Sequence, residues 1–206
     1  MKSMNLIDRD VITGLVLAGG RGSRMSGADK GLQNVKGIPM AMHTLLHLQM
    51  QVGRTMINAN RNLSAYEAMG VPVWPDSIEG YIGPLAGILA GLERAETGWM
   101  ITVPCDTPWF PVDLVERLAD AAATAGASMA MAATSQEGPP RLQPGFCLLR
   151  VNLVESLVSF LHAGERDLEM WGAQEGAILV PFEDAEKFRG ADTVEELRQL
   201  HNFRMF

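Results

Sequence analysis

The chain alternates short apolar runs with longer amphipathic segments, and this alternation limits the folds that it can adopt. Runs that are apolar throughout are typical of strands buried on both faces, and apolar residues at helical spacing are typical of helices packed on a sheet. Strands are predicted at 11–18, 55–60, 71–74, 99–103, 128–134, 145–150 and 177–182, and helices at 39–52, 63–69, 85–95, 112–125, 153–162 and 193–202. This order favours an α/β fold with three layers, in which a mostly parallel, twisted sheet carries helices on both faces.

No internal repeat, charge run or Ser/Gly-rich linker divides the sequence, so we expect one domain over residues 1–206. The stretch 136–144 (QEGPPRLQP) is the most turn-like part of the chain, but it is too short to separate two domains. The last helix is expected to begin with a capping box, because Thr193 suits the N-cap position and Glu196 follows three residues later.

Charge and composition exclude several classes of protein. The chain has 24 acidic and 17 basic side chains and a net charge of −7, which argues against a nucleic-acid partner. No window approaches the roughly 20 apolar residues of a membrane span, and no targeting signal is recognised. Two cysteines, Cys105 and Cys147, make neither a disulfide framework nor a zinc motif. We therefore expect a cytoplasmic protein that does not associate with membranes.

A glycine-rich loop, LAGGRGSRMSGADKGL at residues 17–32, follows the first predicted strand. Ligands bind at the carboxyl ends of strands in such sheets, and glycines let backbone N–H groups approach an anion. The loop is neither a Walker A motif nor a dinucleotide fingerprint, because Ala28 and Met25 occupy positions where those motifs need lysine and glycine. From Gly19 to Lys36, four basic side chains accompany one acidic side chain, which suits a polyphosphate. The alternative is a surface turn with solvated basic residues.

The loop resembles the signature of nucleotidyltransferases of the molybdenum cofactor guanylyltransferase type, L-A-G-G-x-x-x-R-M-G-G-x-D-K-G-L, with Ser26 in place of one glycine. The likeness is strong as far as Pro108 and weak beyond it, and it continues through Asn58-Ala59-Asn60-Arg61, Asp76, Gly83-Pro84-Leu85-Ala86-Gly87 and Pro104-Cys105-Asp106-Thr107-Pro108. The resemblance implies a Rossmann-like nucleotidyltransferase fold. It also implies transfer of GMP from GTP to molybdenum-bound molybdopterin, with release of pyrophosphate.

The resemblance also assigns roles to residues in the first half of the chain. Arg24, Lys30 and Asp106 would be catalytic, because nucleotidyl transfer depends on positioning and on neutralising phosphate charge. The nucleotide would be bound by Leu17, Ala18, Gly19, Gly20, Lys30, Asn58, Asp76 and Asp106. Asp106 would also hold Mg²⁺, which takes one or two protein carboxylates together with phosphate oxygens and water.

Each of these roles has a structural alternative. Lys30 could be an ordinary solvated lysine, and Asp106 could cap the following helix, although Asp113 is the nearer candidate for that position. Asn58 and Asp76 could be turn residues that bond to their own backbone. If Asp76 instead contacts the base, its carboxylate would accept from guanine N1–H and N2–H₂, which is our hypothesis for a preference for GTP over ATP.

The acceptor, molybdopterin, is expected in the C-terminal half. Arg141 and Gln143 belong to a stretch that resembles the family's R-x-x-P element, and Arg166 ends a stretch that resembles its G-E-R element. A surface arginine is the alternative for Arg166. The chain departs from the family before the last helix, where Gly190 and Asp192 replace two asparagines. Asp192 is therefore the candidate for a second Mg²⁺ ligand, and the change to Gly190 bears on acceptor specificity.

Other functions stay open at this point. A related enzyme would use CTP with molybdopterin, or a sugar phosphate as acceptor, and a catalytically silent module would bind a nucleotide without turnover. Further partners would be other cofactor-biosynthesis proteins and molybdoenzyme chaperones. His43 and His47 lie one helical turn apart without a carboxylate to complete a metal set, so we interpret them as structural residues. Cys105 is interpreted as a small buried filler.

Overall fold

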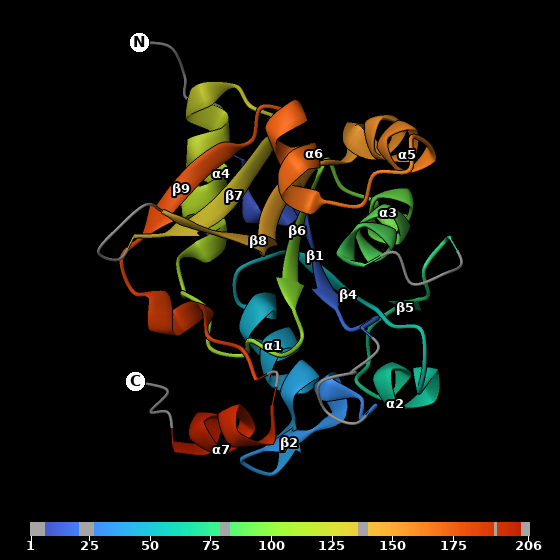
Figure 1. The fold of residues 1–206 in the computed structure, drawn as a ribbon, viewed down its shortest axis with the longest axis vertical. Coiled ribbons are helices and arrows are strands. Elements are labelled where there is room, and N and C mark those ends of the chain that lie inside the picture. The colour runs from blue at the N-terminus through green and yellow to red at the C-terminus, as the bar shows by residue number, and fades with distance from the viewer. Residues whose placement is uncertain (1–6, 21–26, 79–82, 136–139, 192, 203–206) are drawn as a thin grey trace.

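A seven-stranded sheet forms the centre of the protein in a computed structural model that describes residues 7–20, 27–78, 83–135, 140–191 and 193–202 (Figure 1). The strand order is β5-β4-β1-β6-β8-β7-β9. These strands are β1 (Ile12–Leu17), β4 (Arg54–Asn58), β5 (Val73–Trp74), β6 (Trp99–Pro104), β7 (Met129–Thr134), β8 (Arg141–Arg150) and β9 (Ile178–Phe182). The β5–β4, β4–β1, β1–β6 and β7–β9 pairs are parallel, whereas β8 is antiparallel to both of its neighbours. The expected mostly parallel sheet is confirmed.

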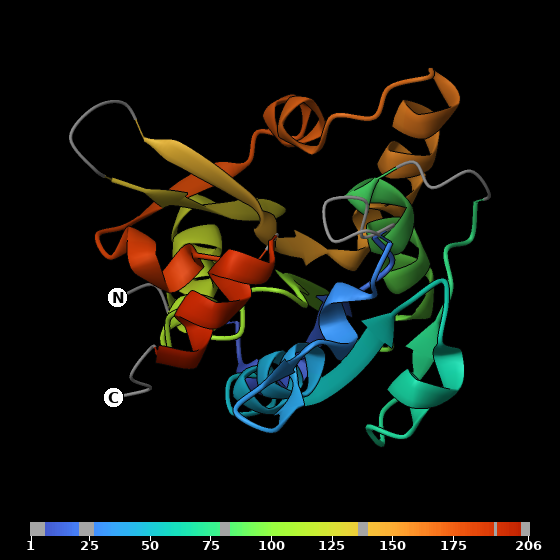
Figure 2. The same cartoon turned by 60° about the horizontal axis from the view of Figure 1, so that its bottom comes forward.

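Helices cover both faces of this sheet, which gives the three predicted layers (Figure 2). On one face, α1 (Met40–Gln49) and α4 (Leu114–Ala125) pack with residues of β1, β6, β7, β8 and β9 into one hydrophobic cluster. On the other face, α3 (Pro84–Arg94), α5 (Val154–His162) and α6 (Leu168–Gln174) form a second cluster with β1, β4, β6, β7 and β8. The central strands are buried along almost their whole length, which explains why they read as continuous apolar runs.

The C-terminal helix α7 (Val194–Asn202) contributes to a third, smaller cluster. This cluster also contains Met40 at the start of α1 and Val35 of β2 (Asn34–Val35), which forms a hairpin with β3 (Ile38–Pro39). The predicted capping box is confirmed, since Glu196 N donates to Thr193 Oγ1 at 3.2 Å and Thr193 N donates to Glu196 Oε2 at 2.9 Å. Short helix α2 (Leu63–Glu67) precedes β5. Within the described residues, no helix has both the length and the apolar character needed to cross a membrane.

The expected turn at 136–144 is wrong for its second part, because β8 begins at Arg141. Residues 136–139 lie outside the described residues. Gln143 pairs with Ala132 of β7 and Cys147 pairs with the adjacent Met131, so Pro144, Gly145 and Phe146 form a wide bulge. A proline has no N–H to give to a strand ladder, and a bulge is where a strand tolerates one. The bulge therefore allows a turn-like sequence to lie within a strand.

Helix α6 and the β2–β3 hairpin were not predicted from the sequence. Helix α6 has only seven residues, which is too short for a clear helical period. Its local signal is Asp167, whose carboxylate accepts from the backbone N–H groups of Glu169 and Met170 at 2.8 and 3.2 Å.

Candidate active site

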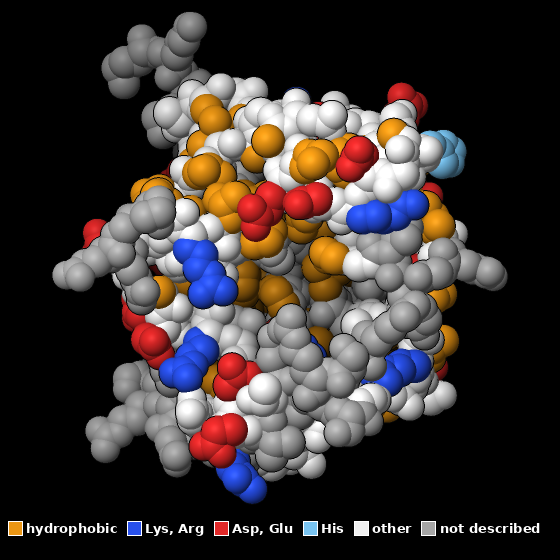
Figure 3. Space-filling view, viewed as in Figure 1, with side chains coloured by type: hydrophobic (Ala, Val, Ile, Leu, Met, Phe, Trp, Pro, Cys, Tyr) orange, Lys and Arg blue, Asp and Glu red, His pale blue; other side chains and the backbone are white. Residues whose placement is uncertain are grey.

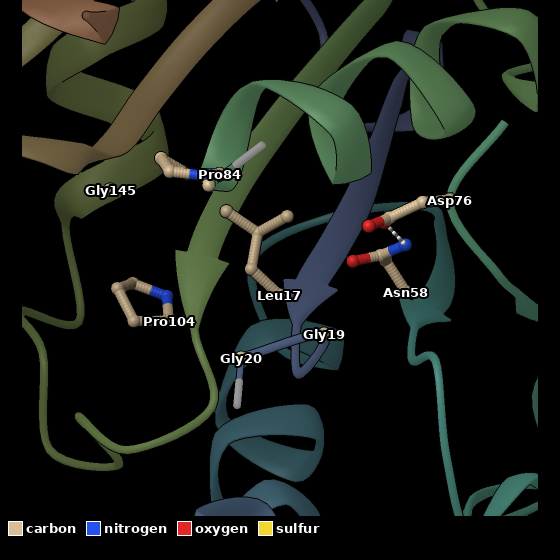
Figure 4. Close-up of a pocket in the computed structure, with 9 residues that line it drawn as sticks. Leu17, Gly19, Gly20, Asn58, Asp76, Pro84, Pro104 and Gly145 are labelled. Carbon is tan, nitrogen blue, oxygen red and sulfur yellow. Dashed lines mark hydrogen bonds between the residues drawn. The ribbon is translucent and has the colours of Figure 1, made fainter. Parts of the chain in front are cut away.

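A pocket of about 370 Å³ lies at the carboxyl ends of β1, β4 and β6, where an α/β sheet is expected to bind ligands (Figure 4). Among the described residues, nine line it: Leu17, Gly19, Gly20, Asn58, Asp76, Gly83, Pro84, Pro104 and Gly145. In the space-filling view, apolar side chains border part of a hollow near the middle of the molecule (Figure 3). The pocket therefore brings together five of the residues predicted to bind a nucleotide: Leu17, Gly19, Gly20, Asn58 and Asp76.

Asn58, Asn60 and Asp76 form a hydrogen-bonded group on one side of the pocket. Asn58 Nδ2 donates to Asp76 Oδ1 at 2.9 Å, and Asn60 Nδ2 donates to Asp76 Oδ2 at 2.8 Å. In return, Asp76 N donates to Asn60 Oδ1 at 2.8 Å. Figure 4 shows the Asn58 and Asp76 side chains facing each other beside Leu17. These contacts orient the carboxylate, and a carboxylate has further lone pairs with which to accept hydrogen bonds from a ligand.

Glycines let the backbone come close to this group. A Cβ atom at Gly19 would lie 2.8 Å from both Asn58 Oδ1 and Asn60 Nδ2. A Cβ atom at Gly87 in α3 would lie 2.8 Å from Asn58 Cγ. The absence of a side chain at Gly87 therefore makes room for the Asn58 side chain. Gly83 and Pro84, at the start of α3, line the pocket themselves.

Lys30 and Asp106 form an ion pair, and Asp106 lies two residues after Pro104, which lines the pocket. Lys30 Nζ lies 3.3 Å from Asp106 Oδ2, and the two side chains are 22% and 19% exposed. Lys30 begins the 3-10 helix Lys30–Leu32, and Asp106 comes two residues after the end of β6. The sequence predicted both residues for the phosphate end of the site, and the structure places their charged groups in contact.

The segment before α7 packs against the Asp106 turn. Ala191 N donates to Asp106 O at 3.0 Å, and a Cβ atom at Gly190 would lie 3.4 Å from Asp106 Oδ1. The position where the family has asparagine is therefore beside the predicted metal ligand, although the two are 84 positions apart in the sequence. Asp192 itself and Arg24 lie outside the described residues, so their predicted roles stay predictions.

The predicted acceptor residues are more dispersed. Gln143 Nε2 donates to Thr134 Oγ1 at 3.2 Å, and Arg141 is exposed at the start of β8. Arg166 is also exposed, and its Nη1 donates to Leu161 O at 2.8 Å, which places it at the C-terminal end of α5. None of these three lines the pocket, whereas Gly145 of the β8 bulge does. A Cβ atom at Gly145 would lie 2.6 Å from Pro104 Cγ, so the bulge closes directly on the end of β6.

His43, His47 and Cys105 contact other parts of the fold in ways that indicate structural roles. His43 Nε2 bonds with Val35 O at 2.7 Å and His47 Nε2 with Phe110 O at 2.8 Å, as expected for structural residues. Burial raises the pKa of the Cys105 thiol, and the nearby carboxylates of Asp106 and Asp29 raise it further. Cys105 therefore stays protonated and buried, which agrees with its interpretation as a filler.

Four residues around the glycine-rich loop were not predicted to have a role in the site. They are Asn60, described above, and Arg61, Asn62 and Tyr66, which contact the end of the loop at residues 27–29. Asn60 and Arg61 belong to a sequence block that resembles the family. That resemblance could have marked them as site residues, but it implied no contact for either side chain. Nothing in the local sequence marks the Tyr66 side chain, which is the one buried residue of α2.

Asp106 also fits a metal ion. Among residues 7–20, 27–78, 83–135, 140–191 and 193–202, no group of three or more His, Cys, Asp or Glu side chains forms a preorganised metal cluster. Magnesium does not need one, because it retains water and takes phosphate oxygens as ligands beside one or two carboxylates. The Asp106 carboxylate is partly exposed and contacts Lys30 at the end of the glycine-rich loop, so it meets that requirement.

A comparison with known families matches residues 14–177 to the MobA-like NTP transferase domain. The chain belongs to this family. The protein from Bordetella pertussis named molybdenum cofactor guanylyltransferase is 60% identical over 96% of this chain and 100% of the relative. A protein of the same name from Acidovorax sp. is 57% identical over 95% of this chain and 97% of the relative. The resemblance inferred from the motifs is confirmed, and the protein is a nucleotidyltransferase.

Solved structures confirm the fold of this MobA-like domain. The molybdopterin-guanine dinucleotide biosynthesis protein A of Archaeoglobus fulgidus superposes with a TM-score of 0.71 at 18% identity, over 92% of this chain and 97% of that chain. The 4-diphosphocytidyl-2C-methyl-D-erythritolsynthase of Anaerococcus prevotii superposes with a TM-score of 0.75 at 12% identity, over 95% of this chain and 98% of that chain. At these identities the likeness concerns the fold alone.

Proposed function

We propose that this MobA-like protein transfers GMP from GTP to molybdenum-bound molybdopterin, forming the guanine dinucleotide cofactor and releasing pyrophosphate. The observation that carries the proposal is the contact of Lys30 with Asp106 next to a pocket with the Asn58–Asp76 pair in its wall. Relatives named for this activity at 57–60% identity over nearly the whole chain support the choice of nucleotide and acceptor.

The base end of GTP occupies the pocket in this proposal. Leu17 and Pro84 offer apolar contacts to a planar ring, and Asp76 offers carboxylate acceptors to guanine N1–H and N2–H₂. Adenine has no N–H donor at the first of these positions, so a preorganised carboxylate discriminates against ATP. Asn58 and Asn60 hold that carboxylate in place, which lowers the cost of ordering it when the nucleotide binds.

The triphosphate follows the glycine-rich loop from Ala18, Gly19 and Gly20 toward Lys30. Backbone N–H groups of this loop and the Lys30 ammonium, aided by Arg24, compensate the charge of the triphosphate. An oxygen of the acceptor phosphate attacks the α-phosphorus, the bond from that phosphorus to the β-phosphate bridging oxygen breaks, and pyrophosphate leaves. Lys30 and Arg24 contribute to catalysis by neutralising charge on the transferring and leaving groups.

Asp106 is the proposed Mg²⁺ ligand, with Asp192 as the candidate for a second one. The ion supplies charge neutralisation and orientation of phosphate oxygens when bound. The backbone contact of Ala191 with Asp106 supports a shared role for the two segments, because it brings the residue before Asp192 to the Asp106 turn. Lys30 must exchange part of its contact with Asp106 for the phosphates when the nucleotide binds.

The acceptor site is proposed for the side of the pocket formed by Pro104 and the β8 bulge at Gly145. Arg141, Gln143 and Arg166 remain the proposed polar contacts for molybdopterin and its phosphate. We further propose one domain over residues 1–206, with the GTP and Mg²⁺ site in the N-terminal half and the acceptor site in the C-terminal half. Both halves of the chain contribute strands to one sheet, which supports a single domain. The first half supplies β1, β4, β5 and β6, and the second half supplies β7, β8 and β9.

A cytoplasmic location and contacts with other cofactor-biosynthesis proteins and molybdoenzyme chaperones complete the proposal. Two buried free thiols, Cys105 and Cys147, suit a reducing compartment. No nucleic-acid or membrane partner is proposed.

The decisive experiment is a panel of nucleotides and acceptors scored by pyrophosphate release with purified protein and Mg²⁺. GTP with molybdenum-bound molybdopterin should give the highest kcat/KM. A preference for CTP, or turnover with a sugar phosphate, would replace the proposed substrates with those of a related enzyme. Tight GTP binding without pyrophosphate release from any acceptor would instead indicate a nucleotide-binding module.

A further inference from the structure

Asp29, the residue before Lys30, is a buried carboxylate that three side chains from the β4–α2 region contact. Tyr66 Oη donates to Asp29 Oδ1 at 2.6 Å, and Asn62 Nδ2 donates to Asp29 Oδ2 at 2.9 Å. Arg61 Nε lies 3.7 Å from the same Oδ2. Only 8% of Asp29 is exposed, so the carboxylate depends on these groups to offset its lost hydration.

The Tyr66 hydroxyl also lies against the residue that follows Lys30. A Cβ atom at Gly31 would lie 2.5 Å from Tyr66 Oη, so the absence of a side chain at Gly31 is what admits the hydroxyl. Burial raises the pKa of Tyr66 well above its ordinary value, which keeps the hydroxyl protonated as a donor. One buried group thus contacts the residue on each side of Lys30.

The β4–α2 region also forms hydrogen bonds with the backbone just before Asp29. Arg61 Nη1 donates to Gly27 O at 2.7 Å, and its Nη2 donates to Ala28 O at 3.0 Å. These contacts fix the exit of the glycine-rich loop, and Asn60 Nδ2 bonds with Gly19 O at 3.2 Å near its entry. The β4–α2 segment therefore connects the loop that carries Lys30 to the wall of the base pocket.

We propose that Tyr66 is a positioning residue for Lys30, acting through the Asp29 carboxylate and by contact with Gly31. It does not touch the substrate; it holds the backbone from which the lysine side chain reaches the triphosphate. The inference rests on the proposed function of Lys30. The ammonium of a lysine lies at the end of a long side chain, so the position of its backbone decides which phosphate oxygens it can reach.

Tyr66→Phe tests this inference, since it removes only the hydroxyl. We expect kcat/KM for GTP to fall by about 10-fold to 100-fold, as a displaced catalytic group does. We also expect weaker binding of GTP with Mg²⁺ in isothermal titration calorimetry, with the circular dichroism spectrum unchanged. The matched control is Thr13→Val, which removes a buried hydroxyl bonded to Thr97 Oγ1 at 2.7 Å at the opposite end of β1. It should leave kcat and KM unchanged.

The deciding measurement is a double-mutant cycle with Lys30→Met. If Tyr66 acts through Lys30, adding Tyr66→Phe to Lys30→Met should change kcat/KM by less than about twofold, because the group being positioned is already absent. Equal losses from Tyr66→Phe with and without Lys30 would overturn the positioning role, as would normal kinetics of Tyr66→Phe alone. Normal kinetics of Lys30→Met would overturn both this inference and the proposed role of Lys30.

A second variant covers the case in which Tyr66→Phe does not fold. Asn62 is exposed and has a φ of 51°, so Asn62→Gly suits its backbone while removing the other direct hydrogen bond to Asp29. It should lower kcat/KM for GTP in the same direction and show the same loss of effect in the Lys30→Met background. An unchanged kcat/KM in a folded Asn62→Gly protein would contradict the inference.

Discussion

Lys30 Nζ and Asp106 Oδ2 lie 3.3 Å apart although 76 positions separate the two residues in the chain. Two parallel strands bring them together, because Lys30 follows β1 and Asp106 follows the adjacent β6. Each is a group that a triphosphate with its metal ion would engage. In the proposed reaction, the ion pair would hold these two charged groups in place until the nucleotide complex replaces part of the contact.

Asp106→Asn should slow turnover strongly while the protein stays folded. The substitution keeps the shape but removes the charge that is proposed to hold a metal ion, so we expect kcat to fall by at least about 100-fold, measured by pyrophosphate release. The Mg²⁺ concentration that gives half of the maximal residual rate should increase. Asp113→Asn is the control, since Asp113 pairs with Arg117 on the same segment away from the pocket. A normal rate for Asp106→Asn would contradict the metal assignment.

Asp76→Asn should reduce the preference for GTP over ATP. The amide would present a donor where Asn58 and Asn60 already donate, and it would lose an acceptor for the guanine edge. We expect the ratio of kcat/KM for GTP to that for ATP to fall by about 10-fold or more, as for loss of a base-specific hydrogen bond. An equal loss for both nucleotides would mean that Asp76 only supports the pocket wall.

Gly87→Ala should disturb the Asn58 side chain. The new methyl group would overlap Asn58 Cγ, which lies 2.8 Å from its position, so α3 or the asparagine must move. We expect the free energy of unfolding to fall by about 1–3 kcal/mol, typical of overpacking, and GTP binding to weaken. Denaturant titration and calorimetry measure the two effects. Gly98→Ala is the control, because a Cβ atom there meets nothing within 4 Å.

His47 should make the protein less stable in mild acid. Burial lowers its pKa below the ordinary 6.5, outweighing the hydrogen bond to Phe110 O, and Lys187 lowers it further. The unfolded state then binds a proton more readily than the folded state. The contribution of His47 to the free energy of unfolding should be constant above about pH 6.5 and should decline below it. His47→Gln should flatten this decline in denaturant titrations, whereas His43→Gln, which keeps His47, should retain it.

Strands were predicted correctly from the sequence where both of their faces are buried. Strands such as β1 and β6 are buried on both faces, so a continuous apolar run was enough to find them. The first part of β8 was mistaken for a turn, because Pro144 and Gly145 are turn residues by composition. Their place in a strand depends on pairing with β7 and on the bulge, which are long-range contacts with no local signal.

The sequence by itself determined the fold class and the family, and it led to the predicted roles of the charged groups of Lys30 and Asp106, because each of these depends on a local motif or a period. Only the tertiary structure decided how those groups are held. Tyr66 and Asp29 are 37 positions apart, and Asn58 and Asp76 are 18 apart. Their contacts exist because parallel strands bring distant loops to one edge of the sheet, and a hydrogen bond across that edge leaves no trace in the spacing of residues along the chain.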